Sequence, residues 1–233
     1  MTMLQAEQVS FSYQGKHETV HAVKDFNYDF KPGCFYAIVG KSGSGKTTLL
    51  SLLAGLELPT QGQVLFQGNA TAQMDCDRYR RDHAAVIYQN FNLFSQLTAQ
   101  ENVMYPLRLQ KVDRQEAVQR AQEALTQVGL SPAQWRRYPS HLSGGEQQRV
   151  AIARTLAIRC EIILADEPTG NLDEENTKSI TDLLLRLAHE QDRCVIVVTH
   201  DLSIAARADA VLELRDGRLE KNTFNHSSDV NQK

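Results

Sequence analysis

Glycine, hydroxyl and lysine residues are concentrated between positions 40 and 48 of the chain. Glycines let a loop curl so that several backbone N–H groups point at one anion, and a helix that follows adds the positive end of its dipole. The Lys46 ammonium can reach the β- and γ-phosphates of a nucleotide, and the Thr47 hydroxyl can hold Mg²⁺. The residues predicted to contact the phosphates are Gly40, Ser42, Gly43, Ser44, Gly45, Lys46, Thr47 and Thr48.

The flanking sequence favours this interpretation over an ordinary glycine-rich turn. An apolar run at 35–39 precedes the loop, and the leucine-rich segment 49–54 follows it. The order is therefore strand, glycine loop and helix, which is the context that a GxxxxGK[ST] phosphate-binding loop requires. The chain is predicted to bind a nucleoside triphosphate.

Two carboxylates follow another apolar run, at 162–165. In an α/β sheet, ligands gather at the carboxyl ends of the strands, so Asp166 and Glu167 are expected to meet the phosphate loop. Asp166 would then organise Mg²⁺, and Glu167 would accept a proton from an attacking water. The alternative is a strand that simply ends in a polar turn.

A second glycine-rich helix start lies at 142–149, with the sequence LSGGEQQR. Ser143 can cap the helix, and unpaired backbone N–H groups follow it. One chain would thus carry two anion-binding helix ends, unless this segment is only a capped helix after a loop.

The remaining pattern indicates an α/β protein with a mostly parallel sheet, an N-terminal antiparallel β region and an inserted helical subdomain. Continuous apolar runs suit strands that are buried on both faces of a parallel sheet. The helix that starts at Asp113 is expected to have a capping box with Glu116. Strands are predicted at 4–12, 20–30, 34–39, 83–89, 161–165 and 194–198, helices at 46–55, 113–128, 145–158 and 175–190, and a closing hairpin at 211–219.

Bulk properties restrict the partners and the compartment. The 233 residues carry a net charge of −3, which gives no electrostatic reason to expect nucleic acid as the main partner. Neither a bilayer-spanning apolar run nor a signal peptide is apparent, so the protein is expected in the cytosol. The four cysteines are scattered, and Cys160 and Cys194 are predicted to be buried thiols without a metal or a disulfide.

The motifs GKSGSGKTT, LSGGEQQR and ILADEPTGNLD together resemble the ATP-binding subunit of ABC transporters. The resemblance extends to about residue 221 and implies one ATPase domain over 1–221. It divides that domain into a RecA-like P-loop NTPase core at 1–89 and 159–221 and a helical subdomain at about 90–158. The tail at 222–233 is polar and is expected to be mobile.

The resemblance also implies roles for single residues. Gln89 corresponds to the Q-loop glutamine, which contacts Mg²⁺ and the attacking water, so that the metal ligands would be Thr47, Gln89 and Asp166. His200 corresponds to the switch histidine that contacts the γ-phosphate, and Tyr13 to the aromatic residue that stacks on adenine.

In this family two subunits pack head to tail around two ATP molecules. Ser143, Gly144 and Gly145 would then contact the partner's nucleotide, and Asp173, in the D-loop 171–173, would lie at the dimer interface. Intact Lys46, Glu167 and His200 argue against a module that binds ATP without hydrolysing it.

The segments 88–94, 97–103 and 168–173 resemble the lipoprotein-release and macrolide- or peptide-export branch of the family. That branch implies an ATPase on the inner face of the cell membrane, bound to a permease. Apolar residues at 91–97 could grip the permease or pack the helical subdomain onto the core, and the stretch 67–82 is expected to be a solvated charged surface. An alternative is a non-transport ABC ATPase that couples to a membrane protein for signalling or cell-division control.

Overall fold

The predicted apolar runs form the centre of a six-stranded sheet in the computed structural model, which describes residues 2–15, 18–170 and 172–225. Five strands are parallel, namely β3 (Phe35–Val39), β6 (Ala84–Ile87), β7 (Ile162–Asp166), β8 (Cys194–Val198) and β9 (Ala210–Arg215), and β10 (Arg218–Phe224) returns antiparallel to β9. All five residues of β8 are buried, as expected for a strand covered on both faces. In sheet order the strands are β10, β9, β3, β8, β7 and β6.

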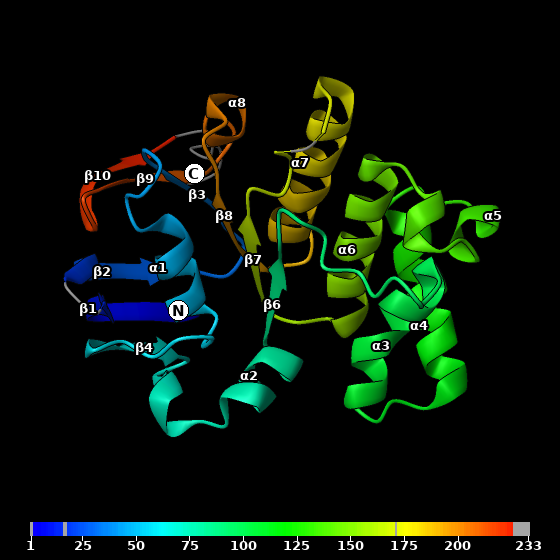
Figure 1. Cartoon of the computed structure of the whole chain (residues 1–233), viewed down its shortest axis with the longest axis horizontal. Helices are drawn as coiled ribbons and strands as arrows, with labels where there is room; N and C mark the ends of the chain where they lie inside the picture. Colours follow the sequence, from blue (N-terminus) through cyan, green and yellow to red (C-terminus); the bar gives the residue numbers. More distant parts are fainter. Residues whose placement is uncertain (1, 16–17, 171, 226–233) are drawn as a thin grey trace, which may run out of the picture.

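A second, antiparallel sheet is built from the N-terminal part of the chain. Its strand order is β2 (Thr19–Phe30), β1 (Leu4–Gln14), β4 (Gln61–Phe66) and β5 (Asn69–Ala70). Helix α1 (Lys46–Leu53) lies between the two sheets, and its buried leucines share one apolar cluster with Phe30 of β2 and Ile196 of β8. The phosphate loop is therefore anchored on both sides by packed structure (Figure 1).

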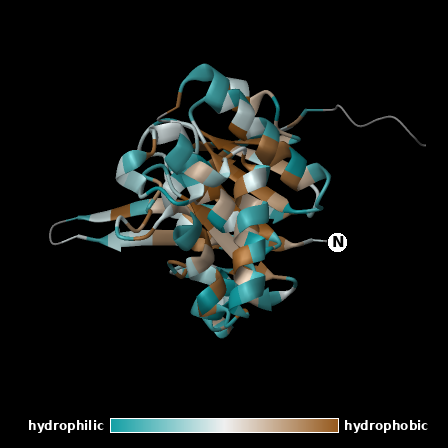
Figure 2. Ribbon diagram, turned by 90° about the vertical axis from the view of Figure 1, so that its right-hand side faces the viewer, coloured by the Kyte–Doolittle hydropathy of each residue, from teal (hydrophilic) through white to brown (hydrophobic). Residues whose placement is uncertain are grey.

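The other face of the six-stranded sheet is covered by helices. Helices α3 (Ala99–Leu109), α4 (Arg114–Gln127) and α6 (Gly144–Ile158) pack on one another beyond strand β6, and α7 (Glu174–His189) lies against the sheet (Figure 1). Apolar residues concentrate in the interior, while the outer helix surfaces are hydrophilic (Figure 2). The other helices of the described residues are α2 (Cys76–Asp82), α5 (Pro132–Trp135) and α8 (Leu202–Ala205), with short 3₁₀ turns at Thr71–Gln73 and Pro139–His141.

The expected α/β architecture is confirmed, with its antiparallel N-terminal region and mostly parallel sheet. Within the described ranges, no helix is long and apolar enough to cross a membrane. All four cysteines are free thiols, and burial raises the pKa of Cys160 to about 11.

Two local predictions in the helical part and before it are wrong. Asp113 caps α4 by accepting from the Gln115 N–H at 2.8 Å, and the Glu116 carboxylate pairs with Arg120 one turn later instead of completing a capping box. An i, i+4 arginine competes for that carboxylate. The stretch 67–82 is only partly solvated, because Tyr79 is fully buried and donates its hydroxyl to Leu53 O at 3.0 Å.

The predicted tail also begins too early. Strand β10 continues to Phe224, which pairs with Ala210, because the ladder with β9 supplies hydrogen bonds to a polar segment. The side-chain amide of Asn225 then donates to Ala208 O at 2.9 Å. The rest of the predicted tail, 226–233, lies outside the described residues.

Candidate nucleotide site

The phosphate loop connects β3 to α1 and is closely packed at its glycines. Gly45 is the residue before α1 and has a φ of 99°, and a Cβ there would lie 2.1 Å from Ala22 O. A Cβ on Gly40 would lie 2.2 Å from Leu214 O. Only glycine fits these two positions, because any side chain there would collide with the backbone of β2 or β9. These two glycines therefore allow the loop to pack closely against both strands.

Lys46 is the first residue of α1, and its side chain folds back over the loop. The Nζ atom donates to Gly40 O at 2.9 Å and to Lys41 O at 3.0 Å. These carbonyls hold the ammonium beside the loop, where it can meet a phosphate oxygen.

The end of β7 lies next to the loop. Thr47 Oγ1 donates to Asp166 Oδ1 at 3.3 Å. The pKa of Asp166 is raised, chiefly by burial and further by the neighbouring Glu167 charge. The hydrogen bond from Thr47 and the Lys46 charge oppose this rise. A cation would therefore stabilise the ionised form of this carboxylate.

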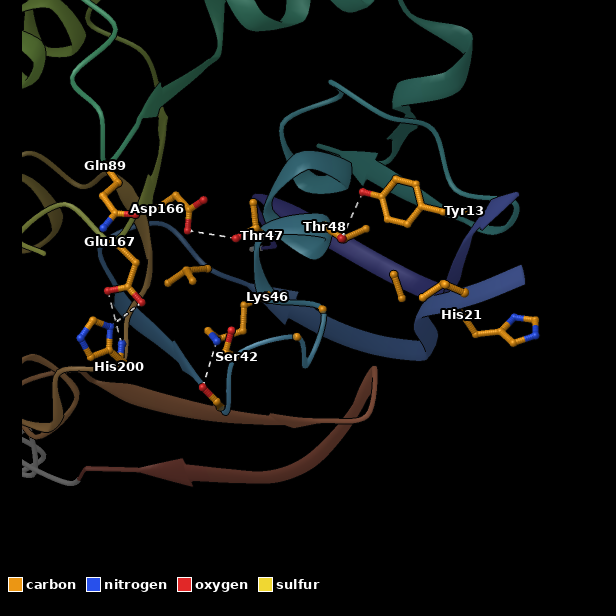
Figure 3. Close-up of a pocket in the computed structure, with 16 residues that line it drawn as sticks. Tyr13, His21, Ser42, Lys46, Thr47, Thr48, Gln89, Asp166, Glu167 and His200 are labelled. Atoms are coloured by element: carbon orange, nitrogen blue, oxygen red, sulfur yellow. Dashed lines mark hydrogen bonds and ion pairs between the residues drawn. The ribbon is translucent and has the colours of Figure 1, made fainter. Parts of the chain in front are cut away.

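Glu167 links the ends of two parallel strands. Its Oε1 lies 2.9 Å from His200 Nδ1, and its Oε2 accepts from Thr199 Oγ1 at 3.3 Å. Its own backbone has a φ of 47°, an uncommon conformation for a side-chain-bearing residue. The carboxylate that follows β7 is thus held in place by residues that follow β8 (Figure 3).

Tyr13 forms another wall of the same site. Its hydroxyl and Thr48 Oγ1 are 3.2 Å apart, and its ring contacts Phe11 edge-on at 4.9 Å between centroids. The side chain is 47% exposed, which leaves ring surface for an aromatic ligand.

These residues surround one cavity of about 510 Å³, shown in Figure 3. Gln89 is part of the wall, and a Cβ on Gly170 would lie 3.1 Å from its Nε2. Of the predicted contacts, Ser44 does not line the cavity; its side chain is buried in the loop. The lining consists of Tyr13, Val20, His21, Ala22, Gly40, Ser42, Gly43, Gly45, Lys46, Thr47, Thr48, Gln89, Asp166, Glu167, Val198 and His200.

Four of these residues were not predicted from the sequence. Val20, His21 and Ala22 belong to β2 and Val198 ends β8, and none of them is part of a motif. The sequence offered only an indirect indication of the β2 residues, namely that β2 pairs with β1 and places Val20 opposite Tyr13. A residue opposite a candidate ligand contact is itself a candidate.

The second glycine-rich helix start is separate from this cavity. Ser143 caps α6 in a capping box: Glu146 N donates to Ser143 Oγ at 3.2 Å, and Ser143 N donates to Glu146 Oε2 at 2.6 Å. The bond from Ser143 N is the main cause of the lowered pKa of Glu146. Ser143 and Gly144 are exposed on the surface.

The predicted D-loop residue lies beside that start. A Cβ on Gly145 would lie 3.3 Å from Asn176, whose backbone N–H donates to Asp173 Oδ1 at 2.8 Å. Asp173 therefore caps α7, and the bond lowers its pKa. Asn171 lies outside the described residues. Within one chain, Ser143, Gly144, Gly145 and Asp173 form a second cluster that does not line the cavity.

Comparisons with known proteins agree with this arrangement. Residues 23–170 match the family model described as ABC transporter. The chain is 40% identical over 217 residues to the ABC transporter ATP-binding protein YclH of Bacillus subtilis, covering 93% of this chain and 95% of the relative. It is also 40% identical to the macrolide export ATP-binding/permease protein MacB of Escherichia coli, covering 94% of this chain but 34% of MacB.

A solved structure of MJ0796 from Methanocaldococcus jannaschii has the same fold. It is described as a dimeric, post-hydrolysis ATP-binding cassette bound to ADP and Pi. It matches with a TM-score of 0.90 and 38% identity, over 95% of this chain and 98% of the other. Together with the phosphate loop and the carboxylates that face it, these matches place the chain in the ABC transporter family, as one of its ATP-binding proteins.

Proposed function

We propose that this chain is the ATP-hydrolysing subunit of a transporter, that it works as a head-to-tail dimer, and that it drives a permease of the lipoprotein-release or macrolide-export type. One observation carries the proposal: the Glu167 carboxylate is held by His200 in the wall of the cavity that the phosphate loop also lines. A base and a phosphate cradle that share one cavity suit hydrolysis of a nucleoside triphosphate.

The cavity offers a separate region for each part of ATP. The loop glycines and the start of α1 present backbone N–H groups to the phosphates, and Lys46 neutralises the β- and γ-phosphates. Tyr13 stacks on adenine, and Thr48 holds the tyrosine through its hydroxyl.

The residues at the end of β7 fit Mg²⁺. Thr47 Oγ1, Asp166 and Gln89 supply oxygen ligands of the kind that this ion prefers, and burial makes a cation favourable beside Asp166. When bound, Mg²⁺ would neutralise charge on the β- and γ-phosphate oxygens.

Glu167 performs the proton transfer. It accepts a proton from the water that attacks the γ-phosphorus, and the products are ADP and inorganic phosphate. His200 orients the carboxylate through its Nδ1 and contacts the γ-phosphate from its exposed side, since its side chain is 73% exposed.

The second cluster completes the site of a partner copy. Ser143, Gly144, Gly145 and Asp173 lie on the surface outside the cavity of their own chain, so they are available to the nucleotide of another. Ser143 Oγ accepts from Glu146 N, and its hydroxyl proton, which also lies within reach of the Glu146 carboxylate, could turn to donate to the γ-phosphate. The dimeric MJ0796 relative supports this arrangement.

The helical subdomain, about 90–158, is proposed to carry the permease contact. Leu93 packs against the core cluster, whereas Phe94 is 43% exposed and its ring contacts Tyr105 at 4.5 Å between centroids. The segment at 91–97 thus packs inward at Leu93 and presents aromatic surface at Phe94. A permease bound to that surface would hold the protein on the inner face of the membrane. The transport proteins among its relatives favour this function over signalling.

The decisive test is Glu167→Gln. The variant should bind ATP normally, but steady-state turnover should fall by about 100-fold or more, because the general base is lost. An ATP-bound dimer should accumulate, measured by light scattering with and without ATP and Mg²⁺. Glu190→Gln, an exposed glutamate after α7, is the matched control and should behave as wild type. Turnover of Glu167→Gln at the wild-type rate would remove Glu167 from the mechanism.

A further inference from the structure

A cavity of about 310 Å³ lies at the other end of α6 from Ser143. Its walls come from α4, from the end of α6 and from the segment that leads into β8. The cavity therefore lies at the junction between the helical subdomain and the core. None of its lining residues belongs to the nucleotide cavity or to the second cluster.

The lining is strongly basic. Arg120 of α4, Arg159 at the end of α6 and Arg193 before β8 face a single acid, Glu123, and the polar lining also includes Gln127 and Gln191. The net charge of the lining is therefore +2, from three arginines and one glutamate. Three guanidinium groups from three separate elements would repel one another in an empty cavity.

The carboxylates nearby neutralise only part of this charge. Arg120 pairs with Glu116 along α4, and the Arg159 Nη2 atom lies 3.8 Å from Glu123 Oε2, at the limit of an ion pair. Among the described residues, no carboxylate pairs with Arg193. Burial raises the pKa of the Cys160 thiol, and the Arg193 charge partly opposes that rise, so the charge lies near the end of α6.

Two of these guanidinium groups also have donors without acceptors. Arg120 Nε and Arg193 Nη1 are closed off from solvent, and within the described residues neither has a hydrogen-bond partner. A buried donor without an acceptor is costly, so native proteins usually satisfy it. An oxygen-rich anion in the cavity would supply acceptors to these two nitrogens once the arginine side chains turn toward it.

We propose that this cavity binds a compact dianion of the phosphate class, held by Arg120, Arg159 and Arg193. A tetrahedral oxyanion offers acceptors in several directions, whereas a carboxylate presents two oxygens in one plane. A charge of about −2, typical of a phosphate group near neutral pH, matches the lining. The bound anion would tie α4 and α6 to the core.

Direct binding tests the proposal in the full chain. The nucleotide site is first filled with a non-hydrolysable ATP analogue and Mg²⁺, so that its γ-phosphate position is closed. Radiolabelled inorganic phosphate is then titrated by equilibrium dialysis in physiological chloride. We expect one additional equivalent of phosphate to bind.

Paired substitutions assign that equivalent to the cavity. Arg120→Gln with Arg193→Gln should weaken phosphate binding by at least about tenfold, because two charged hydrogen-bond donors are lost. The control is Arg114→Gln with Arg136→Gln, which removes the same charge from exposed positions and should leave binding unchanged. Arg193→Gln alone carries the test if the double variant fails to fold by circular dichroism.

A second ligand distinguishes the source of the phosphate group. Glycerol 3-phosphate that binds as tightly as inorganic phosphate would mean that the group alone is recognised, and tighter binding would indicate a phosphorylated metabolite. Either result supports the proposal. Absence of the additional equivalent, or unchanged binding in the Arg193→Gln variant, would overturn it.

Discussion

The two glycine-containing helix starts of this chain differ in how the positive end of the helix dipole is compensated. Helix α1 begins after Gly45 with no acidic residue in its first turn, and its first residues line the nucleotide cavity. Helix α6 begins after Ser143 on the surface, and Glu146 in its first turn folds back onto the cap. The N-terminus of α1 therefore remains open to an external anion, whereas the N-terminus of α6 is already partly neutralised by the Glu146 carboxylate.

This difference suggests why the second start needs a partner. A helix end compensated by Glu146 attracts phosphate less strongly than the open end of α1. It can contribute when another chain presents a nucleotide that is already bound. Dimerisation would then depend on ATP, and the two helix starts should respond differently to substitution.

The largest expected effect is on the α1 side. Lys46→Ala removes the charged donor that we propose for the phosphates, a loss worth about 2–5 kcal/mol, so nucleotide affinity should fall by roughly 30-fold or more. Fluorescent ATP analogue titration of the monomer measures it. Lys41→Ala, an exposed lysine in the same loop, is the control. An unchanged affinity in Lys46→Ala would mean that the ammonium only braces the loop.

How much of this comparison the sequence could predict depends on how local each feature is. The phosphate loop and the Ser143 cap rest on residues within one short segment, so their motifs were sufficient. The position of Glu167 against His200 could be expected only from the parallel order of β7 and β8.

Features that depend on competition or on pairing were missed. Glu116 had two possible partners and took Arg120, so the capping box at Asp113 did not form. His21 reaches the cavity through the β1–β2 hairpin, and the length of β10 depends on its ladder with β9. A propensity pattern contains no information about which of two partners a side chain will choose.

The next prediction concerns the α6 side. Ser143→Trp should leave ATP binding by the monomer within about twofold of wild type, because Ser143 lies outside the cavity of its own chain. It should abolish the ATP-dependent dimer, measured by light scattering in the Glu167→Gln background. Ser140→Trp, at another exposed serine nearby, is the steric control. Loss of monomer binding in Ser143→Trp would contradict the assignment of this helix start to the partner's nucleotide.

A smaller effect should distinguish the two ends by pH. The folded pKa of Glu146 is lowered, so its contribution to stability is complete above the unfolded pKa of about 4.3 and is lost as the pH falls through the folded value. Glu146→Gln should therefore cost about 0.5–1 kcal/mol at neutral pH, and the difference from wild type should shrink in acid.

Urea denaturation at several pH values measures this difference. Glu57→Gln, in the exposed segment before β4, is the control for a general charge effect. A gap between wild type and Glu146→Gln that stays constant with pH would show that the carboxylate charge is not what compensates the start of α6.

The smallest change in nucleotide affinity is expected at the edge of the α1 site. Tyr13→Phe keeps the ring and loses only the bond to Thr48 Oγ1, so ATP affinity should change by less than about threefold. Tyr13→Ala removes the stacking surface as well and should cost about 1 kcal/mol, or roughly fivefold. Titration with ATP and with inorganic triphosphate separates the two regions of the cavity, because only ATP has a base to stack. If Tyr13→Ala weakened the binding of ATP and of triphosphate equally, Tyr13 would act by supporting the phosphate loop through Thr48 and not by stacking on the base. The start of α1 would then depend on a side chain from β1, whereas the start of α6 is capped by its own Ser143 and Glu146.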